Sequence, residues 1–181
     1  MSSGGTSAGH DPGHSGRSAG TKRTVRPLDE LDRSILAQLQ EDASVSGAEL
    51  ARRVGLSAPG LQKRVKRLRE IGVVTKQVAL LSREAIDLDL LCFVHVTLAH
   101  HQPDGVSGFR RAVQAMPEVL ECHHLTGEFD YLLKVVAANH RDLEHFLVHR
   151  LTPTPGVDKI RTSIVLNEIK ASTALPLDGR G

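Results

Sequence analysis

The stretch SAPGLQKRVKRLRE, Ser57–Glu70, carries the strongest structural signal in the N-terminal half of this chain. Leucine and valine recur in it at helical spacing, and five cations share the pattern with them: Lys63, Arg64, Lys66, Arg67 and Arg69. A helix of this composition buries one side and presents positive charge on the other. The preceding ELARRVGLS, Glu49–Ser57, predicts a shorter helix that ends at Gly55. Together they predict a helix-turn-helix whose second helix reaches DNA.

Charge is distributed unevenly along the chain, and the distribution indicates a partner. The formal net charge is +2, but residues 52–76 hold eight cations against one acid, Glu70, a local charge of +7. Such a density is what neutralisation of phosphates requires. The alternative is a solvated helix face with no ligand. DNA is favoured because the cations follow a helix-turn-helix pattern.

Composition excludes several other classes of protein. Among the 181 residues, 40% are hydrophobic and no apolar run approaches bilayer length, so neither a membrane protein nor a secretory signal is expected. Two cysteines, Cys92 and Cys122, favour a reducing cytoplasm over a disulfide framework. Aromatic residues make up 3%, which disfavours a single-strand or RNA binder.

Clusters of histidine and cysteine raise the question of a metal. His100 and His101 are adjacent, as are Cys122, His123 and His124. Neighbours in a strand point to opposite faces, so these groups do not converge on one ion, and no metal site is expected.

The first half divides into a tail and a DNA-binding domain. Residues 1–26 are rich in glycine and serine and predict a disordered basic tail. Residues 27–81 predict a winged helix-turn-helix. Its parts are a first helix over Leu28–Leu39, a second capped by Ser46 in a capping box with Glu49, a third capped by Ser57, and a strand or short hairpin, the wing, over Val73–Ser82.

The second half, residues 90–175, predicts a β-α-β-β-α-β order. The expected elements are strands over 90–99, 119–126, 131–136 and 157–169, and helices over 106–116 and 140–151. This is a ferredoxin-like pattern, an antiparallel sheet with both helices on one face. The whole fold class is therefore α+β, and the uncovered sheet face is expected to become a subunit interface.

Motifs in both halves together resemble a known family. The C-terminal half contains E-C-H-x-x-x-G-x-F-D-Y-L-L-K over residues 121–134, and the N-terminal half contains LDELDRSILAQLQEDA, ELARRVGLS and RVKRLREIGVV. The chain resembles the Lrp/AsnC, or feast/famine, regulators over residues 27–175. The resemblance implies a cytoplasmic transcriptional regulator without catalysis or cofactor. It also implies dimerisation through the C-terminal sheets, further assembly into tetramers, octamers or discs, and a small effector, usually an amino acid.

Candidate effector residues follow from the same resemblance, carried over by position: His124, Gly127, Glu128, Asp130, His140, Thr162, Ser163 and Ile164. An amino acid needs an acid for its ammonium and exposed amide hydrogens for its carboxylate, which Asp130 or Glu128 and Gly127 could supply. Turn chemistry alone also explains Gly127 and Asp130, so both interpretations stay open. His124 and His140 stand where apolar residues are common in relatives, which makes polar or aromatic effectors worth testing.

Candidate DNA contacts come from the third helix and the wing. Gln62, Lys63 and Lys66 are expected at base edges or in the groove, and Ser57, Arg64, Arg67, Arg69 and Lys76 mainly on phosphate. Two copies of the helix would enter successive major grooves of a pseudo-palindromic site. The alternative function is a siroheme-decarboxylase-like enzyme, which resembles this family in both domains. The basic third helix counts against it, since a decarboxylase has no physical need for one.

Overall fold

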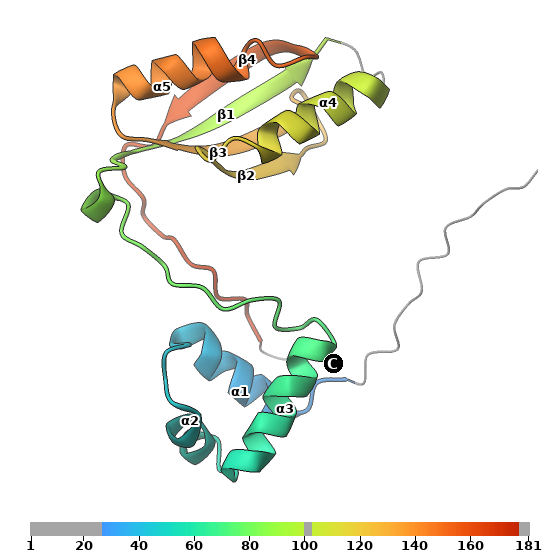
Figure 1. The fold of residues 1–181 in the computed structure, drawn as a ribbon, viewed down its shortest axis with the longest axis vertical. Coiled ribbons are helices and arrows are strands. Elements are labelled where there is room, and N and C mark those ends of the chain that lie inside the picture. The colour runs from blue at the N-terminus through green and yellow to red at the C-terminus, as the bar shows by residue number, and fades with distance from the viewer. Residues whose placement is uncertain (1–26, 100–102, 178–181) are drawn as a thin grey trace, which may run out of the picture. The chain divides into compact units, whose positions relative to one another are not determined.

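The computed structural model describes residues 27–99 and 103–177 of the chain (Figure 1). They form two compact units. One comprises the described residues up to Lys76 together with residues 174–177, and the other comprises the described residues of Gln77–Thr173. The predicted basic tail, residues 1–26, lies outside the described residues.

Three helices build the first unit: α1 (Glu30–Glu41), α2 (Gly47–Arg53) and α3 (Ala58–Glu70). Their apolar positions meet in one core, whose fully buried members include Ile35 and Leu68. Glycines in the left-handed region end the two later helices, Gly55 with φ +67° and Gly72 with φ +78°. A residue with a Cβ is strained in that region, which is why glycine follows each helix.

Side-chain caps fix where the helices begin. The hydroxyls of Ser46 and Ser57 accept from backbone amides at the starts of α2 and α3, which confirms both predicted caps. The predicted capping box at Ser46 is wrong in its second half, because the Glu49 carboxylate accepts hydrogen bonds from two arginines of α2 instead. A complete capping box lies at α1, between Asp29 and Asp32.

The segment after α3 differs from its prediction as a strand or hairpin. A turn follows Glu70, and no strand is assigned before Leu90 among these described residues. Val78, Leu80 and Leu81 in it are 60%, 75% and 70% exposed. A strand forms only where a neighbouring strand satisfies its backbone groups, and none of the strand pairings in the described part of the chain includes this stretch.

The second unit has the predicted order of elements. Strands β1 (Leu90–Leu98), β2 (Val119–His124), β3 (Tyr131–Ala137) and β4 (Val157–Ile164) form an antiparallel sheet in the order β2-β3-β1-β4. Helices α4 (Pro103–Gln114) and α5 (His140–Phe146) lie on one face of it, and a π-helical turn, Leu147–Leu151, continues α5 (Figure 1). β4 ends earlier than predicted, because its pairing with β1 ends where Ile164 meets Cys92.

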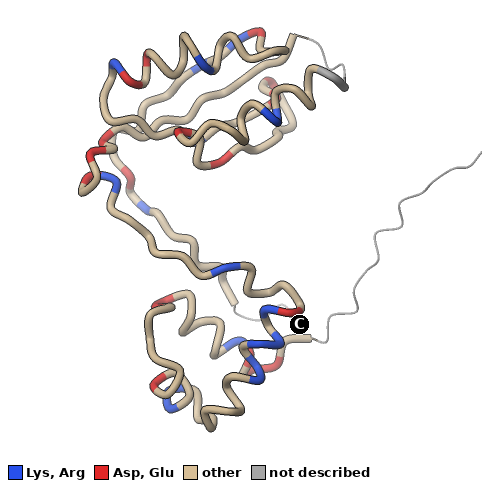
Figure 2. The backbone as a smooth tube through the Cα atoms, in the orientation of Figure 1, with Lys and Arg blue, Asp and Glu red and all other residues tan. Residues whose placement is uncertain are grey.

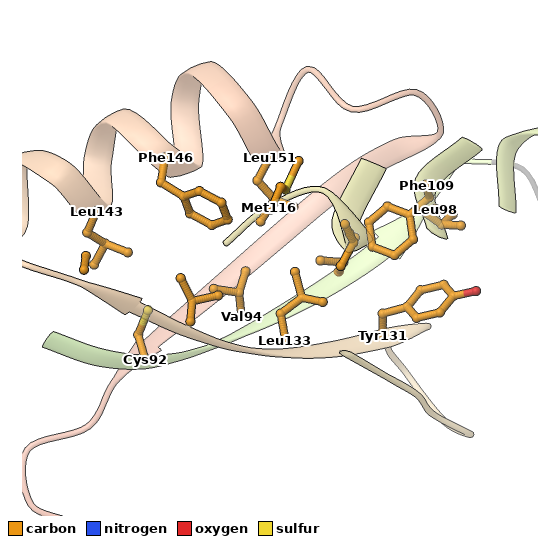
Figure 3. Close-up of a cluster of buried hydrophobic side chains, with 14 residues drawn as sticks. Cys92, Val94, Leu98, Phe109, Met116, Tyr131, Leu133, Leu143, Phe146 and Leu151 are labelled. Carbon is orange, nitrogen blue, oxygen red and sulfur yellow. The ribbon is translucent and has the colours of Figure 1, made fainter. Parts of the chain in front are cut away.

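Alternation along the strands separates a core face from an open face. Cys92, Val94 and Val96 of β1 point toward the helices, where Phe109 and Phe146 cover them (Figure 3). The residues between them on β1, and the residues paired with those across the sheet, point to the other face. That open face carries both apolar and charged side chains: Phe93, His95, Glu121, His123, Leu132, Lys134, Lys159, Arg161 and Ser163.

None of the helices in the described ranges combines the length and the apolar character needed to cross a membrane.

Candidate DNA interface and effector site

Helix α3 carries the densest group of cations in the first unit (Figure 2). Leu61 and Leu68 are buried on its inner side. Most residues predicted to contact DNA are exposed, as that role requires: Ser57, Gln62, Lys63, Lys66, Arg69 and Lys76. The proline at Pro59 stands in the first turn, where its missing amide hydrogen breaks no helical bond.

Two of the predicted phosphate contacts, Arg64 and Arg67, are held inside the unit. Arg64 donates from Nη1 to both carboxylate oxygens of Asp29, at 2.9 and 2.7 Å, and to Asp32 at 2.9 Å. Arg67 donates from Nη1 to the other oxygen of Asp32 at 2.9 Å. Asp32 is fully buried, while each arginine side chain is 29% exposed. The structure therefore gives both arginines a role in joining α1 to α3.

The ion pairs stabilise the charged forms of their members. The Arg64 guanidinium, followed by the backbone amide of Asp32, lowers the pKa of the Asp29 carboxyl below its ordinary value. In return, the carboxylates of Asp29 and Asp32 raise the pKa of Arg64. Hydrogen bonding to the ionised form is what moves both groups in these directions.

A hollow of about 650 Å³ lies along the side of α3 that carries Arg64 and Arg67. Its lining comprises Asp29, Gly60, Lys63, Arg64, Lys66, Arg67 and Glu70, four cations and two acids. Lys66 and Glu70 approach each other to 3.8 Å across exposed surface, which contributes little to stability. Cations therefore outnumber acids in the lining of the hollow, and its net positive charge suits a phosphate or another anion.

The sequence carries only a partial signal for the pairing of α1 with α3. Asp29 and Asp32 stand three residues apart at a helix start, and Arg64 and Arg67 stand three residues apart in α3. Residues at that spacing share a helix face. Sequence patterns alone gave no reason to place these two faces together.

The predicted effector residues of the β2–β3 hairpin lie close together. Gly127 has φ +122°, a conformation that requires glycine. Asp130 accepts from the Leu98 amide at 2.8 Å and donates its own amide to Val96 at 3.0 Å, so it fastens the turn to β1. These bonds support the turn-building interpretation of Asp130. The effector interpretation of the same residue stays a prediction.

Aromatic contacts surround this hairpin. His124 stacks on Tyr131 with ring centroids 4.9 Å apart, and Phe129 contacts His95 at 4.6 Å. Tyr131 is 3% exposed, and its hydroxyl has no hydrogen-bond partner among the described residues. Glu128 is exposed at the tip of the turn.

The other predicted effector residues lie at the opposite end of the sheet. His124 pairs with Tyr131, which pairs with Val96 near the end of β1, whereas Ile164 pairs with Cys92 near its start. Those positions on β1 are about 13 Å apart. Thr162 and Ser163 belong with Ile164, and His140 follows β3 at that same end. An amino acid is too short to touch both groups within one chain.

Neither metal chemistry nor thiol chemistry has a site in the described residues. No three histidine, cysteine or acidic side chains of that part of the chain are placed to hold an ion. Burial raises the pKa of the Cys92 thiol to about 11, and burial also raises that of Cys122. Neither thiol is activated as a nucleophile.

A cationic helix-turn-helix and a half-covered βαββαβ sheet together define a DNA-binding regulator with a separate sensing and assembly unit. Family models agree with both halves: residues 28–75 match a winged helix-turn-helix DNA-binding domain, and residues 91–175 match the Lrp/AsnC ligand binding domain. The chain belongs to the Lrp/AsnC family of transcriptional regulators.

Individual relatives match over nearly their whole length. The leucine-responsive regulatory protein of Serratia marcescens is 40% identical over 161 residues, 89% of this chain and 98% of the relative. A transcriptional regulator of Neisseria meningitidis, solved with L-methionine, superposes with a TM-score of 0.81 at 39% identity, over 84% of this chain and 98% of that one. A feast or famine regulatory protein of M. tuberculosis, also solved with L-methionine, gives 0.75 at 34% identity, over 82% and 99%. These relatives are regulators, and none of these findings favours the decarboxylase alternative.

Replacing the buried carboxylate tests whether it holds α1 to α3. Asp32→Asn leaves two guanidinium groups without their shared charge, and we expect a loss of about 3 kcal/mol in the free energy of unfolding of the first unit. Urea unfolding followed by helical circular dichroism measures it. Glu30→Gln, an exposed change in the same turn, is the matched control and should alter stability by less than about 0.5 kcal/mol. Equal stability of the two variants would refute the role of Asp32.

The Glu49 carboxylate predicts a defined acid response. Hydrogen bonds from Arg52, and then from Arg53, lower its pKa from 4.5 to about 2. Because the folded pKa is depressed, its stabilising contribution is complete above the ordinary value of 4.5 and is lost as the pH falls toward 2. Wild type should therefore lose more stability than Glu49→Gln over that range. An NMR titration of the Glu49 carboxyl with a midpoint near 4.5 would contradict the assignment.

Proposed function

We propose that two copies of α3 bind neighbouring half-sites of duplex DNA and that a small amino acid controls this binding through the second unit. The observation that supports the DNA contacts is the exposed cationic side of α3, which the ion pairs of Asp32 join to α1. Gln62, Lys63 and Lys66 are assigned to the groove, with Ser57, Arg69 and Lys76 on phosphates. Arg64 and Arg67 contribute mainly by holding the helix.

The assembly we propose is a homo-oligomer, built first from a dimer. Open sheet faces of two subunits would cover each other, since half-buried Phe93 and Leu132 lie there beside charged groups that can pair across a two-fold axis. Larger assemblies, tetramers or octamers, would join such dimers. A cytoplasmic location fits a regulator that meets both the chromosome and free amino acids.

The proposed effector is an amino acid, and L-methionine is the first to test because two structural neighbours were solved with it. Separation of the two groups of candidate residues supports a site shared between chains. One chain would supply the hairpin group, His124, Gly127, Glu128 and Asp130. A second would supply the group at the other end of the sheet, His140, Thr162, Ser163 and Ile164.

Two single substitutions separate base reading from phosphate contact. Gln62→Ala should lower affinity for the preferred sequence by about 1–3 kcal/mol and relax specificity at one position. Lys76→Ala should weaken binding to all sequences alike and reduce the slope of log affinity against log salt by about 1, because one phosphate is no longer neutralised. Fluorescence anisotropy across a salt series measures both. Lys170→Ala, an exposed lysine outside the DNA-binding unit, controls for the change in charge.

Mixing two defective chains tests the shared effector site. Glu128→Gln and Thr162→Val should each abolish methionine binding in a uniform oligomer. In co-refolded mixtures, about one quarter of the sites would combine an intact hairpin with an intact β4, because each site draws on two chains. Calorimetry should therefore recover binding in the mixture. No recovery, with both single variants folded and assembled, would place the site within one chain.

A further inference from the structure

The C-terminal segment returns to the DNA-binding unit and lies on α1. The side-chain amide of Gln40 makes two hydrogen bonds to the backbone of Leu175. Its Nε2 donates to the Leu175 carbonyl at 3.1 Å, and its Oε1 accepts from the Leu175 amide at 2.7 Å. Two turns back along α1, Arg33 Nη1 donates to the carbonyl of Leu177 at 2.9 Å. These two hydrogen bonds satisfy both the N–H and the C=O of Leu175, as the backbone of a neighbouring β-strand would.

One side chain anchors this contact. Leu177 is half-buried and packs against the core of the first unit, while Leu175 is 71% exposed. Pro176 between them has no amide hydrogen that would need a partner. A single apolar anchor with backbone recognition by two polar side chains is a weak and reversible mode of docking.

The return of the segment means that the chain passes between the two units twice. Residues 77–89 run from the end of the first unit to β1, and residues 165–173 run from β4 to the docked segment. Fully extended, they reach at most about 45 and 30 Å respectively. While the segment is docked, both lengths limit the excursion of α3 from the sheet. When it is released, only the longer connection remains.

We propose that residues 174–177 form a detachable second tether whose docking face is the Gln40 and Arg33 side of α1. This proposal rests on the proposed function, since its consequence concerns two copies of α3 in one dimer. Docking narrows the range of spacings that the two helices can adopt. The second helix then meets its half-site at a higher effective concentration, whereas binding to one isolated half-site is unaffected.

The test compares the full chain with a chain truncated after Thr173 and with Leu177→Ser. Leu166→Ser, which changes a leucine of the connecting segment that is 98% exposed, is the matched control. Two duplexes serve as probes: one selected in vitro for wild-type binding, and the same duplex with one half-site randomised. We expect truncation and Leu177→Ser to weaken binding to the paired site roughly tenfold and to leave single-half-site binding unchanged.

A free peptide distinguishes two explanations for a loss of affinity: the segment connects the two units, or it only stabilises the fold of the DNA-binding unit. The peptide KASTALPL, residues 170–177, should bind the truncated chain, and its Leu177→Ser version should not. Bound peptide should fail to restore paired-site affinity, because it carries no connection to β4. In excess, it should displace the tail of the full chain and reproduce the tenfold loss.

Other outcomes overturn the proposal in distinct ways. Equal losses on both duplexes, or restoration by the free peptide, would mean that the segment only supports the fold of the DNA-binding unit. No loss on either duplex would mean that the docking has no consequence for DNA, and no peptide binding would mean that α1 does not hold this segment. If the selection in vitro recovered no duplex that wild type binds, the proposed function would fail, and peptide binding would still decide whether the docking face exists.

Discussion

The fully buried carboxylate of Asp32 is the interaction on which the DNA-binding unit depends. Each of its oxygens accepts from a different arginine of α3, and its own position is set by the capping box that begins α1. A buried charge is unfavourable unless it is paired and hydrogen-bonded, and here both conditions are met. Apolar packing alone would allow α3 to slide or turn on α1. A carboxylate that binds two guanidiniums adds directional contacts to this packing, so it helps to determine which side of α3 is exposed.

The sheet of the second unit is covered by helices on one face only. Helices cover one face of the sheet, and the other face keeps Phe93 and Leu132 half-buried next to Glu121, Lys134 and Arg161. Glu121 pairs with His123 at 2.9 Å and Lys134 at 3.5 Å within the same face. A surface with both apolar and paired charged groups suits a specific contact with a second copy better than solvent. The separation of the two groups of effector candidates agrees with such a contact, since in the proposed function each end of the sheet would supply one part of a site shared between subunits.

Sequence patterns predicted those features that depend on local order. Serine caps, glycine stops and the positions of all four strands follow from signals that act within a few residues. What the patterns missed are contacts between distant segments. The pairing of Arg64 and Arg67 with Asp32 was missed because periodicity shows that a side chain is on the outer part of a helix, not that α1 brings a carboxylate to it. Val73–Ser82 was predicted to be a strand because alternating apolar and polar residues indicate a preference for extended backbone. That pattern does not show whether another strand lies beside it to form the hydrogen bonds of a sheet. The docking of Leu177 has no periodic signal, since one leucine after a proline in a polar tail is ordinary composition.

The ion pairs also change how the charge of the helix-turn-helix should be understood. Residues 52–76 carry +7 in the sequence, but three acids from outside that window, Asp29, Asp32 and Glu49, are hydrogen-bonded to arginines within it. Counting those acids lowers the local charge from +7 to +4. Non-specific attraction to phosphate is therefore smaller than composition suggests, and more of the affinity has to come from geometry. Geometry for a paired site means correct orientation of each α3 and correct spacing of the two. The ion pairs of Asp32 contribute to the orientation of each α3. The spacing of the two helices depends on how far each DNA-binding unit can move from its sheet, and the proposed docking of the C-terminal segment would limit that movement.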